Sequence, residues 1–131
     1  MATRNPWSKL KEEASKIRTP TLILRTQAKM LSDTTRGVIR GRVDIEEESN
    51  AAFLKFSVYV PTLNNYEVVL FGVRQPVTQY PATLVPEWGE IGTVKCENDA
   101  ELEEAVVNYC EGPDMQRIVT GLFAQAGQAQ G

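Results

Sequence analysis

Residues 51–74 read AAFLKFSVYVPTLNNYEVVLFGVR, and this stretch indicates the kind of fold the chain adopts. Its first half alternates, with Leu54, Phe56, Val58 and Val60 on one face and Phe53, Lys55, Ser57 and Tyr59 on the other. A period of two is typical of a half-buried β-strand. Pro61 ends this strand because it lacks a backbone N–H, and Asn64–Asn65 predicts a short turn because asparagine tolerates positive φ.

The second half of the stretch, from Tyr66 to Arg74, is apolar on both faces. Tyr66, Val68 and Leu70 alternate with Val69, Phe71 and Val73. A strand with two apolar faces is usually central in its sheet and covered on both sides. We therefore expect this strand to be the central one and to lie between two layers.

Further strands are predicted on both sides of this pair. An alternating pattern from Arg36 to Glu46 predicts a strand before it, and residues 77–85, interrupted by Pro81, predict one after it. A short fifth strand is expected at residues 91–96. Each connection is about five residues or fewer, whereas parallel strands need a crossover of a dozen or more. The sequence therefore predicts an antiparallel meander of about five strands.

Helical patterns stand at both ends of the chain. Asn5–Pro6 predicts the start of a first helix, whose apolar stripe consists of Trp7, Leu10, Ala14 and Ile17. Thr19–Pro20 ends that helix and starts a second one with a broader apolar face, to about Ser32, which we expect to pack on the sheet. Asn98, with Glu101 at capping-box spacing, and Asp114 mark two further helices.

This order of elements predicts an α+β fold, with two N-terminal and two C-terminal helices flanking the sheet. We expect a single domain over residues 1–125 and a flexible tail over residues 126–131, which are small and polar. The periodicities place six residues in the core: Leu24, Leu31, Phe56, Val58, Leu70 and Ile118.

The composition excludes several chemistries. The chain has 131 residues and no histidine, which removes Ser-His-Asp and Cys-His catalysis and histidine-based zinc sites. Cys96 and Cys110 are too few for a four-cysteine metal site and do not form a CxxC pair, so two reduced, packed thiols are expected. The sequence therefore favours a non-catalytic protein over an enzyme and indicates no metal and no cofactor. Without a leader or an apolar run of about 20 residues, we expect a cytoplasmic protein that does not enter a membrane.

Charge is unevenly distributed along the chain. Residues 1–42 carry ten basic and three acidic side chains, and the remaining residues carry four basic and fourteen acidic ones. The basic third can pack beside the acidic remainder, or it can meet an anion. Under the second interpretation, Arg36, Arg40 and Arg42 grip a nucleic-acid phosphate or an anionic small molecule. The bases are spread over two helices and a strand, which makes nucleic acid the weaker hypothesis.

Three aromatic residues are candidates for contact with a partner. Phe53 and Tyr59 share the second face of their strand, and Trp88 lies in the expected loop Glu87–Gly89. A loop tryptophan either packs on the rim of the core or is exposed to a partner. An apolar sheet face must be covered, either by the C-terminal helices or by another chain, because large exposed apolar patches mark interfaces.

The middle of the chain resembles a group of small uncharacterised bacterial proteins. The resemblance rests on Val60-Pro61-Thr62-Leu63-Asn64-Asn65-Tyr66, then on Leu70-Phe71 and Tyr80-Pro81. The chain departs from that pattern at Gln75, where a more polar or histidine-containing stretch is expected. The resemblance implies a cytoplasmic bacterial protein, and it supplies no activity and no catalytic residue.

Two functions remain from the sequence. The first is a non-catalytic protein-interaction module that self-associates or serves as an accessory subunit in bacterial regulation or defence, with Phe53, Tyr59 and Trp88 in contact with the partner. The second is a binder of nucleic acid or an anionic small molecule through Arg36, Arg40 and Arg42. The absence of catalytic motifs and the two-sided apolar strand favour the first.

Overall fold

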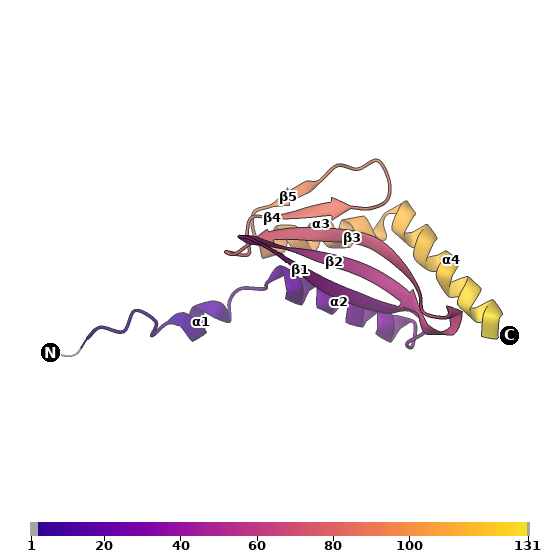
Figure 1. The fold of residues 1–131 in the computed structure, drawn as a ribbon, viewed down its shortest axis with the longest axis horizontal. Helices are drawn as coiled ribbons and strands as arrows, with labels where there is room; N and C mark the ends of the chain where they lie inside the picture. The colour runs from indigo at the N-terminus through magenta and orange to yellow at the C-terminus, as the bar shows by residue number, and fades with distance from the viewer. Residues whose placement is uncertain (1–2, 131) are drawn as a thin grey trace.

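A computed structural model describes residues 3–130 of the chain (Figure 1). The described elements are, in order, α1 (Leu10–Ala14), α2 (Pro20–Thr34), β1 (Arg40–Glu48), β2 (Ala51–Val60), the 3-10 helix η1 (Pro61–Leu63), β3 (Tyr66–Pro76), β4 (Ala82–Pro86), β5 (Val94–Cys96), α3 (Asp99–Glu111) and α4 (Pro113–Gln130).

The strands form one antiparallel sheet in the order β1-β2-β3-β4-β5. Each strand pairs with the next one along the chain because the short connections allow only hairpin-like returns. The strand that starts at Tyr66 is central, as its apolar composition predicts. The predicted α+β fold, with helices before and after an antiparallel meander, is confirmed.

A β-bulge explains why β3 looks apolar on both faces. Phe56 pairs with Phe71, but the next residue, Ser57, pairs with Val69, so Leu70 is an extra residue on β3. A bulge lets two consecutive side chains point to the same side of a sheet. Leu70 and Phe71 are accordingly both buried in the core. The expectation that both faces of β3 are covered is therefore wrong.

Helices α2, α3 and α4 cover one face of the sheet (Figure 1). Gly41 lets α2 lie directly on β1, since a Cβ at this position would be 2.6 Å from Cβ of Ala28. On the central strands, the Phe56 and Phe71 rings stack at 4.9 Å, and Tyr109 of α3 meets Phe71 edge-on. Of the predicted core residues, Leu24, Phe56, Val58 and Leu70 are buried, while Leu31 and Ile118 are partly buried against the core.

Side-chain caps begin the two helices that frame the sheet. The Thr19 hydroxyl accepts a hydrogen bond from the backbone N–H of Leu22, and Pro20 occupies the first turn of α2. Asn98 accepts from the N–H of Glu101, and the Glu101 carboxylate accepts in return from the N–H of Glu97. The capping residues predicted from the sequence therefore start α2 and α3 as expected.

Five predicted boundaries are wrong. Strand β1 begins at Arg40 instead of Arg36, because Arg36 and Gly37 have positive φ in the turn after α2. Strand β5 comprises only Val94–Cys96 instead of residues 91–96, because its pairing with β4 starts at Val94. The first helix comprises only Leu10–Ala14, because Asn5 caps a turn by accepting from the N–H of Trp7 instead of starting a longer helix. Strand β4 begins at Ala82, since Pro81 cannot supply a ladder N–H and residues 77–81 form the loop before it. In the expected tail, α4 continues to Gln130 and buries Ala126 in the core, whereas Gly131 lies outside the described residues.

The close approach of α2 and β1 predicts a sensitive glycine. Gly41→Ala should destabilise the protein by about 1–3 kcal/mol because the new methyl group overlaps the backbone of Ala28. Urea unfolding measures the change. Gly92→Ala is the matched control, since a Cβ there meets nothing within 4 Å and should change the stability by less than about 0.5 kcal/mol. Equal stability of both variants would show that α2 does not lie this close to β1.

Candidate functional site

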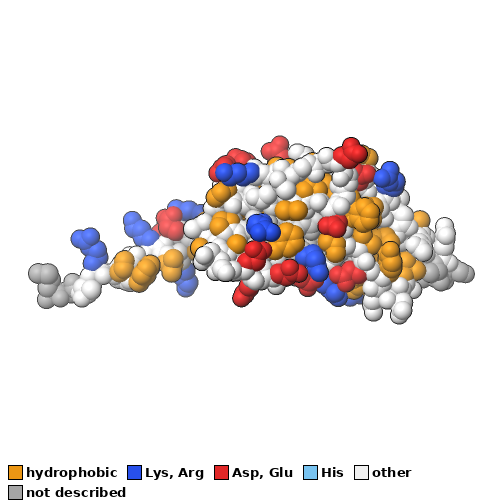
Figure 2. All heavy atoms as spheres, turned by 45° about the horizontal axis from the view of Figure 1, so that its top comes forward, with side chains coloured by type: hydrophobic (Ala, Val, Ile, Leu, Met, Phe, Trp, Pro, Cys, Tyr) orange, Lys and Arg blue, Asp and Glu red, His pale blue; other side chains and the backbone are white. Residues whose placement is uncertain are grey.

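The face of the sheet opposite the helices carries Phe53 and Tyr59, both from β2. Phe53 pairs with Arg74, and its ring lies across the backbone of Gly72, where an added Cβ would be 2.1 Å from Cζ. The Arg74 guanidinium lies 5.8 Å from the Phe53 ring centroid, and that of Arg42 lies 4.9 Å from the Tyr59 centroid. Figure 2 shows hydrophobic side chains on this surface between acidic and basic ones.

Ion pairs hold these arginines in place. Nη1 of Arg42 lies 3.0 Å from Oε2 of Glu67, and Oγ of Ser57 donates to Oε1 of the same carboxylate at 2.7 Å. Arg74 reaches Glu48 at 3.3 Å. The open face is therefore a mixed aromatic and ionic surface whose side chains are already paired with each other.

The three arginines predicted to bind an anion make different contacts. Arg40 and Arg42 share the outer face of β1, but Nε of Arg40 donates to the carbonyl oxygen of Gly37. Arg36 lies in the exposed turn after α2, with φ of 54°. Arg42 is engaged with Glu67 and Tyr59. Two of the three guanidinium groups, those of Arg40 and Arg42, are therefore already bonded within the chain.

One edge of β3 is open over half its length. Strand β4 pairs only with Phe71–Arg74, so the segment Tyr66–Val69 has a strand neighbour on its β2 side alone. Pro86 pairs with Phe71 and has no N–H, and β4 ends there. The N–H of Glu87 makes one more bond to β3, to the carbonyl oxygen of Leu70 at 3.3 Å. Nε1 of Trp88 donates to the carbonyl oxygen of Val69 at 2.7 Å, which shows that this carbonyl points away from β2. In an antiparallel strand the backbone groups of alternate residues point to the same side, so those of Glu67 also face the open edge.

A groove lies between this edge and α4. We call it the β3–α4 groove. Its volume is about 1010 Å³, and its walls include residues 66–69, Trp88, Ile118, Gly121 and Leu122. A Cβ on Gly121 would meet nothing within 4 Å, so the groove has open space next to this residue of α4. The groove thus offers a strand segment without a second strand neighbour on one side. On the other side it offers a face of α4 on which Ile118 and Leu122 lie beside Arg117 and Gln125.

Trp88 connects the groove to the core. Its backbone N–H donates to the Tyr109 hydroxyl at 3.1 Å, and that hydroxyl donates to the Trp88 carbonyl oxygen at 2.9 Å. The side chain is 42% exposed although its indole N–H is bonded to the sheet edge. Trp88 is therefore both fixed in position and accessible to solvent. The sequence left open whether this tryptophan packs on the rim of the core or is exposed, and the structure has features of both. The sequence did not indicate the open edge, because a bulge and the end of a pairing have no periodic signature.

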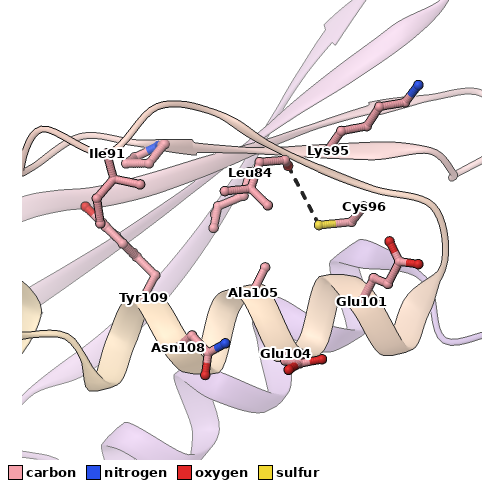
Figure 3. Close-up of a pocket in the computed structure, with 11 residues that line it drawn as sticks. Leu84, Ile91, Lys95, Cys96, Glu101, Glu104, Ala105, Asn108 and Tyr109 are labelled. Atoms are coloured by element: carbon pink, nitrogen blue, oxygen red, sulfur yellow. Dashed lines mark hydrogen bonds between the residues drawn. The ribbon is translucent and has the colours of Figure 1, made fainter.

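A smaller cavity of about 400 Å³ lies between α3 and the β4–β5 segment (Figure 3). Figure 3 shows Cys96 next to α3, Glu101 and Glu104 on that helix, and Lys95 pointing away from it. The Glu101 carboxylate is used in the helix cap, and the Cys96 thiol lies 3.7 Å from the carbonyl oxygen of Val94.

Both cysteines are free thiols, as the sequence predicts. Burial, and to a smaller extent the Glu101 carboxylate, raises the pKa of Cys96. Burial raises the pKa of Cys110 to about 11, with a smaller contribution from Glu111. A thiol with a raised pKa remains protonated near neutral pH and is a weak nucleophile. Cys96 is buried in the core, and Cys110 is partly buried against it.

Between residues 3 and 130, no three Cys, Asp or Glu side chains lie together as a candidate metal site. None of the described helices is long and apolar enough to span a bilayer. No family model, no curated protein and no solved structure matches this chain.

A polar cluster fixes the point where the N-terminal segment joins the domain. The Tyr80 hydroxyl donates to the carbonyl oxygen of Arg18 at 2.6 Å, and the Arg18 N–H donates to Oδ2 of Asp99 at 3.2 Å. The Arg18 guanidinium pairs with Asp99 and Glu103. The hydrogen bond from the backbone N–H of Arg18 is the main reason why the pKa of Asp99 lies below its ordinary value. Burial, followed by the charge of Asp99, raises the pKa of Tyr80 to about 12.

The raised pKa of Tyr80 predicts a loss of stability at alkaline pH. Between pH 10.0 and about 12 the unfolded chain loses this phenolic proton while the folded chain keeps it. The corresponding stabilisation is complete below pH 10.0 and declines as the pH rises toward 12. Tyr80→Phe should therefore flatten the decline of the unfolding free energy in that range, measured by urea unfolding. Tyr66→Phe, at an exposed tyrosine, is the control. A decline as steep in Tyr80→Phe as in the unmodified protein would contradict this prediction.

Proposed function

We propose that this chain is a non-catalytic protein-interaction module that binds an extended segment of another protein as an added strand in the β3–α4 groove. The observation that carries the proposal is the open edge of β3 at residues 66–69 beside Ile118 and Leu122 of α4. In this function the chain is an accessory subunit. Its setting in bacterial regulation or defence, which the sequence led us to expect, remains part of the proposal.

The chemistry of the edge supports an extended ligand. An unpaired strand edge presents alternating N–H and C=O groups that another strand satisfies in register. Side chains of such a ligand would alternate between the groove wall at Ile118 and Leu122 and the rim at Glu67 and Trp88. Backbone hydrogen bonds would supply affinity, and Ile118 and Leu122 would select the side chains.

The open sheet face supports the same function as an adjoining surface. Tyr59 pairs with Glu67, whose backbone also borders the groove, so a bound protein can extend from the edge onto Tyr59 and Phe53. Aromatic side chains held by arginines are typical of interface centres. The second function, anion binding, has weaker support because Arg42 is paired with Glu67 and Arg40 with the Gly37 carbonyl.

Selection of peptides from a displayed random library tests the proposal. Binding is followed by Trp88 fluorescence in a Trp7→Phe background, which leaves Trp88 as the single tryptophan of the chain. We expect selected peptides to bind, and Gly121→Arg to weaken them at least about tenfold by filling the groove. Gly127→Arg is the matched control. It places the same side chain on the same helix, outside the groove residues, where a Cβ also meets nothing within 4 Å.

Peptides with methylated backbone nitrogens separate strand addition from other modes of binding. In an added strand, alternate N–H groups bond to the edge, so methylation at every second residue should abolish binding while methylation at the intervening residues is tolerated. Equal tolerance at all positions, or equal binding by Gly121→Arg and Gly127→Arg, would overturn the proposal.

A further inference from the structure

The N-terminal segment forms an arm that leaves the domain. Residues 3–17 are all exposed, and α1 buries none of its side chains. Backbone hydrogen bonds from Leu10 to Trp7, and from Ile17 to Ala14, extend helical turns on both sides of α1. Figure 1 shows the arm projecting away from the sheet and from the other helices.

The arm carries an apolar stripe without a partner in its own chain. Trp7, Leu10 and Ile17 are 70%, 62% and 52% exposed. Their spacing, with Ala14 between the last two, is that of one side of a helix, the pattern by which an amphipathic helix enters an apolar groove. Figure 2 shows hydrophobic side chains gathered along the arm, with basic ones around them. An exposed stripe of this kind indicates a binding surface.

The junction directs the arm away from its own domain. Both backbone groups of Arg18 are bonded, the N–H to Asp99 and the carbonyl oxygen to Tyr80. The next residue, Thr19, caps α2, and Pro20 is buried. Because these contacts fix the backbone at the point of exit, the stripe faces solvent and can meet another molecule without any rearrangement of the domain.

The helical side of the same chain offers a groove that suits this stripe. Two adjoining hollows of about 580 and 430 Å³ run along α2, between it and α3 and α4, and share Gln27, Met30, Cys110 and Gln116. We call them together the α2–α4 groove. Three large apolar residues on its walls, Leu22, Met30 and Phe123, are 52%, 55% and 47% exposed. The groove begins at Arg18, where the arm leaves the domain.

The opposite charges of the arm and of the rest of the chain indicate that the arm is the ligand of the α2–α4 groove. The arm, residues 3–17, carries four basic and two acidic side chains, whereas residues 18–131 carry ten basic and fifteen acidic ones. Glu103 and Glu111 line the hollow that begins at Arg18, where Glu103 pairs with the Arg18 guanidinium and Glu111 lies at the other end of α3. A basic amphipathic helix is therefore attracted to an acidic domain whose groove matches its apolar stripe.

We propose that the arm of one copy of this chain docks in the α2–α4 groove of a second copy, and that two copies exchange arms reciprocally. Reciprocal exchange gives a closed two-fold dimer, which satisfies both stripes and both grooves at once. This inference goes beyond the proposed function and uses a different surface, so the β3–α4 groove remains open in the dimer.

Light scattering after size-exclusion chromatography, over a series of concentrations, tests the exchange in the full chain. We expect twice the chain mass of 14.6 kDa. Leu10→Glu on the arm and Met30→Glu in the groove should each weaken the dimer at least about tenfold, because each places a charge in the apolar contact. Val77→Glu is the matched control, since Val77 is 80% exposed and lies outside the groove, and it should leave the dimer unchanged.

Mixing the two variants makes the test specific. Leu10→Glu keeps an intact groove and Met30→Glu keeps an intact arm, so a mixture should form mixed dimers more strongly than either variant associates with itself. A chain that remains at 14.6 kDa up to about 1 mM would overturn the inference, whether its arm is free or docked on its own domain. A dimer that persists in both variants would also overturn it, because the contact would then lie elsewhere. Gly121→Arg should leave the dimer intact, which separates this result from that of the peptide experiment.

Discussion

The β-bulge at Leu70 is the constraint on which the rest of the structure depends. By adding one residue to β3, it turns both Leu70 and Phe71 into the core, where Phe71 meets Phe56 and Tyr109. The register changes at this point, and the pairing with β4 stops at Phe71. One local irregularity therefore concentrates the apolar residues of the central strand on a single face and coincides with the end of the β4 ladder.

Two exposed surfaces follow from this arrangement. With the core on one side only, the opposite face carries the ion-paired aromatic surface of Phe53 and Tyr59. With β4 ending early, residues 66–69 face α4 across a groove, and Trp88 bonds to the edge at Val69. The open edge of β3 and the tryptophan fixed beside it are the observations on which the proposed binding of another protein rests.

The sequence predicted what depends on periodicity and local capping. The strand alternation around Phe56, the central place of β3 and the helix caps at Thr19 and Asn98 are local signals, and the structure agrees with them. Features that depend on tertiary pairing were not predictable. The periodicity of β3 cannot distinguish a strand covered twice from a bulged strand covered once, and small residues such as Ala126 resemble a tail until the core that buries them is known.

Amide hydrogen exchange along β3, followed by NMR, tests the open edge most directly. In the free protein the N–H groups of Glu67 and Val69 should exchange rapidly, whereas that of Val68, which points to β2, should be protected. When a peptide selected for binding is added, the N–H groups of Glu67 and Val69 should become protected as well. If they are already protected in the free protein, or remain unprotected when the peptide is bound, the β3 edge is not the binding site.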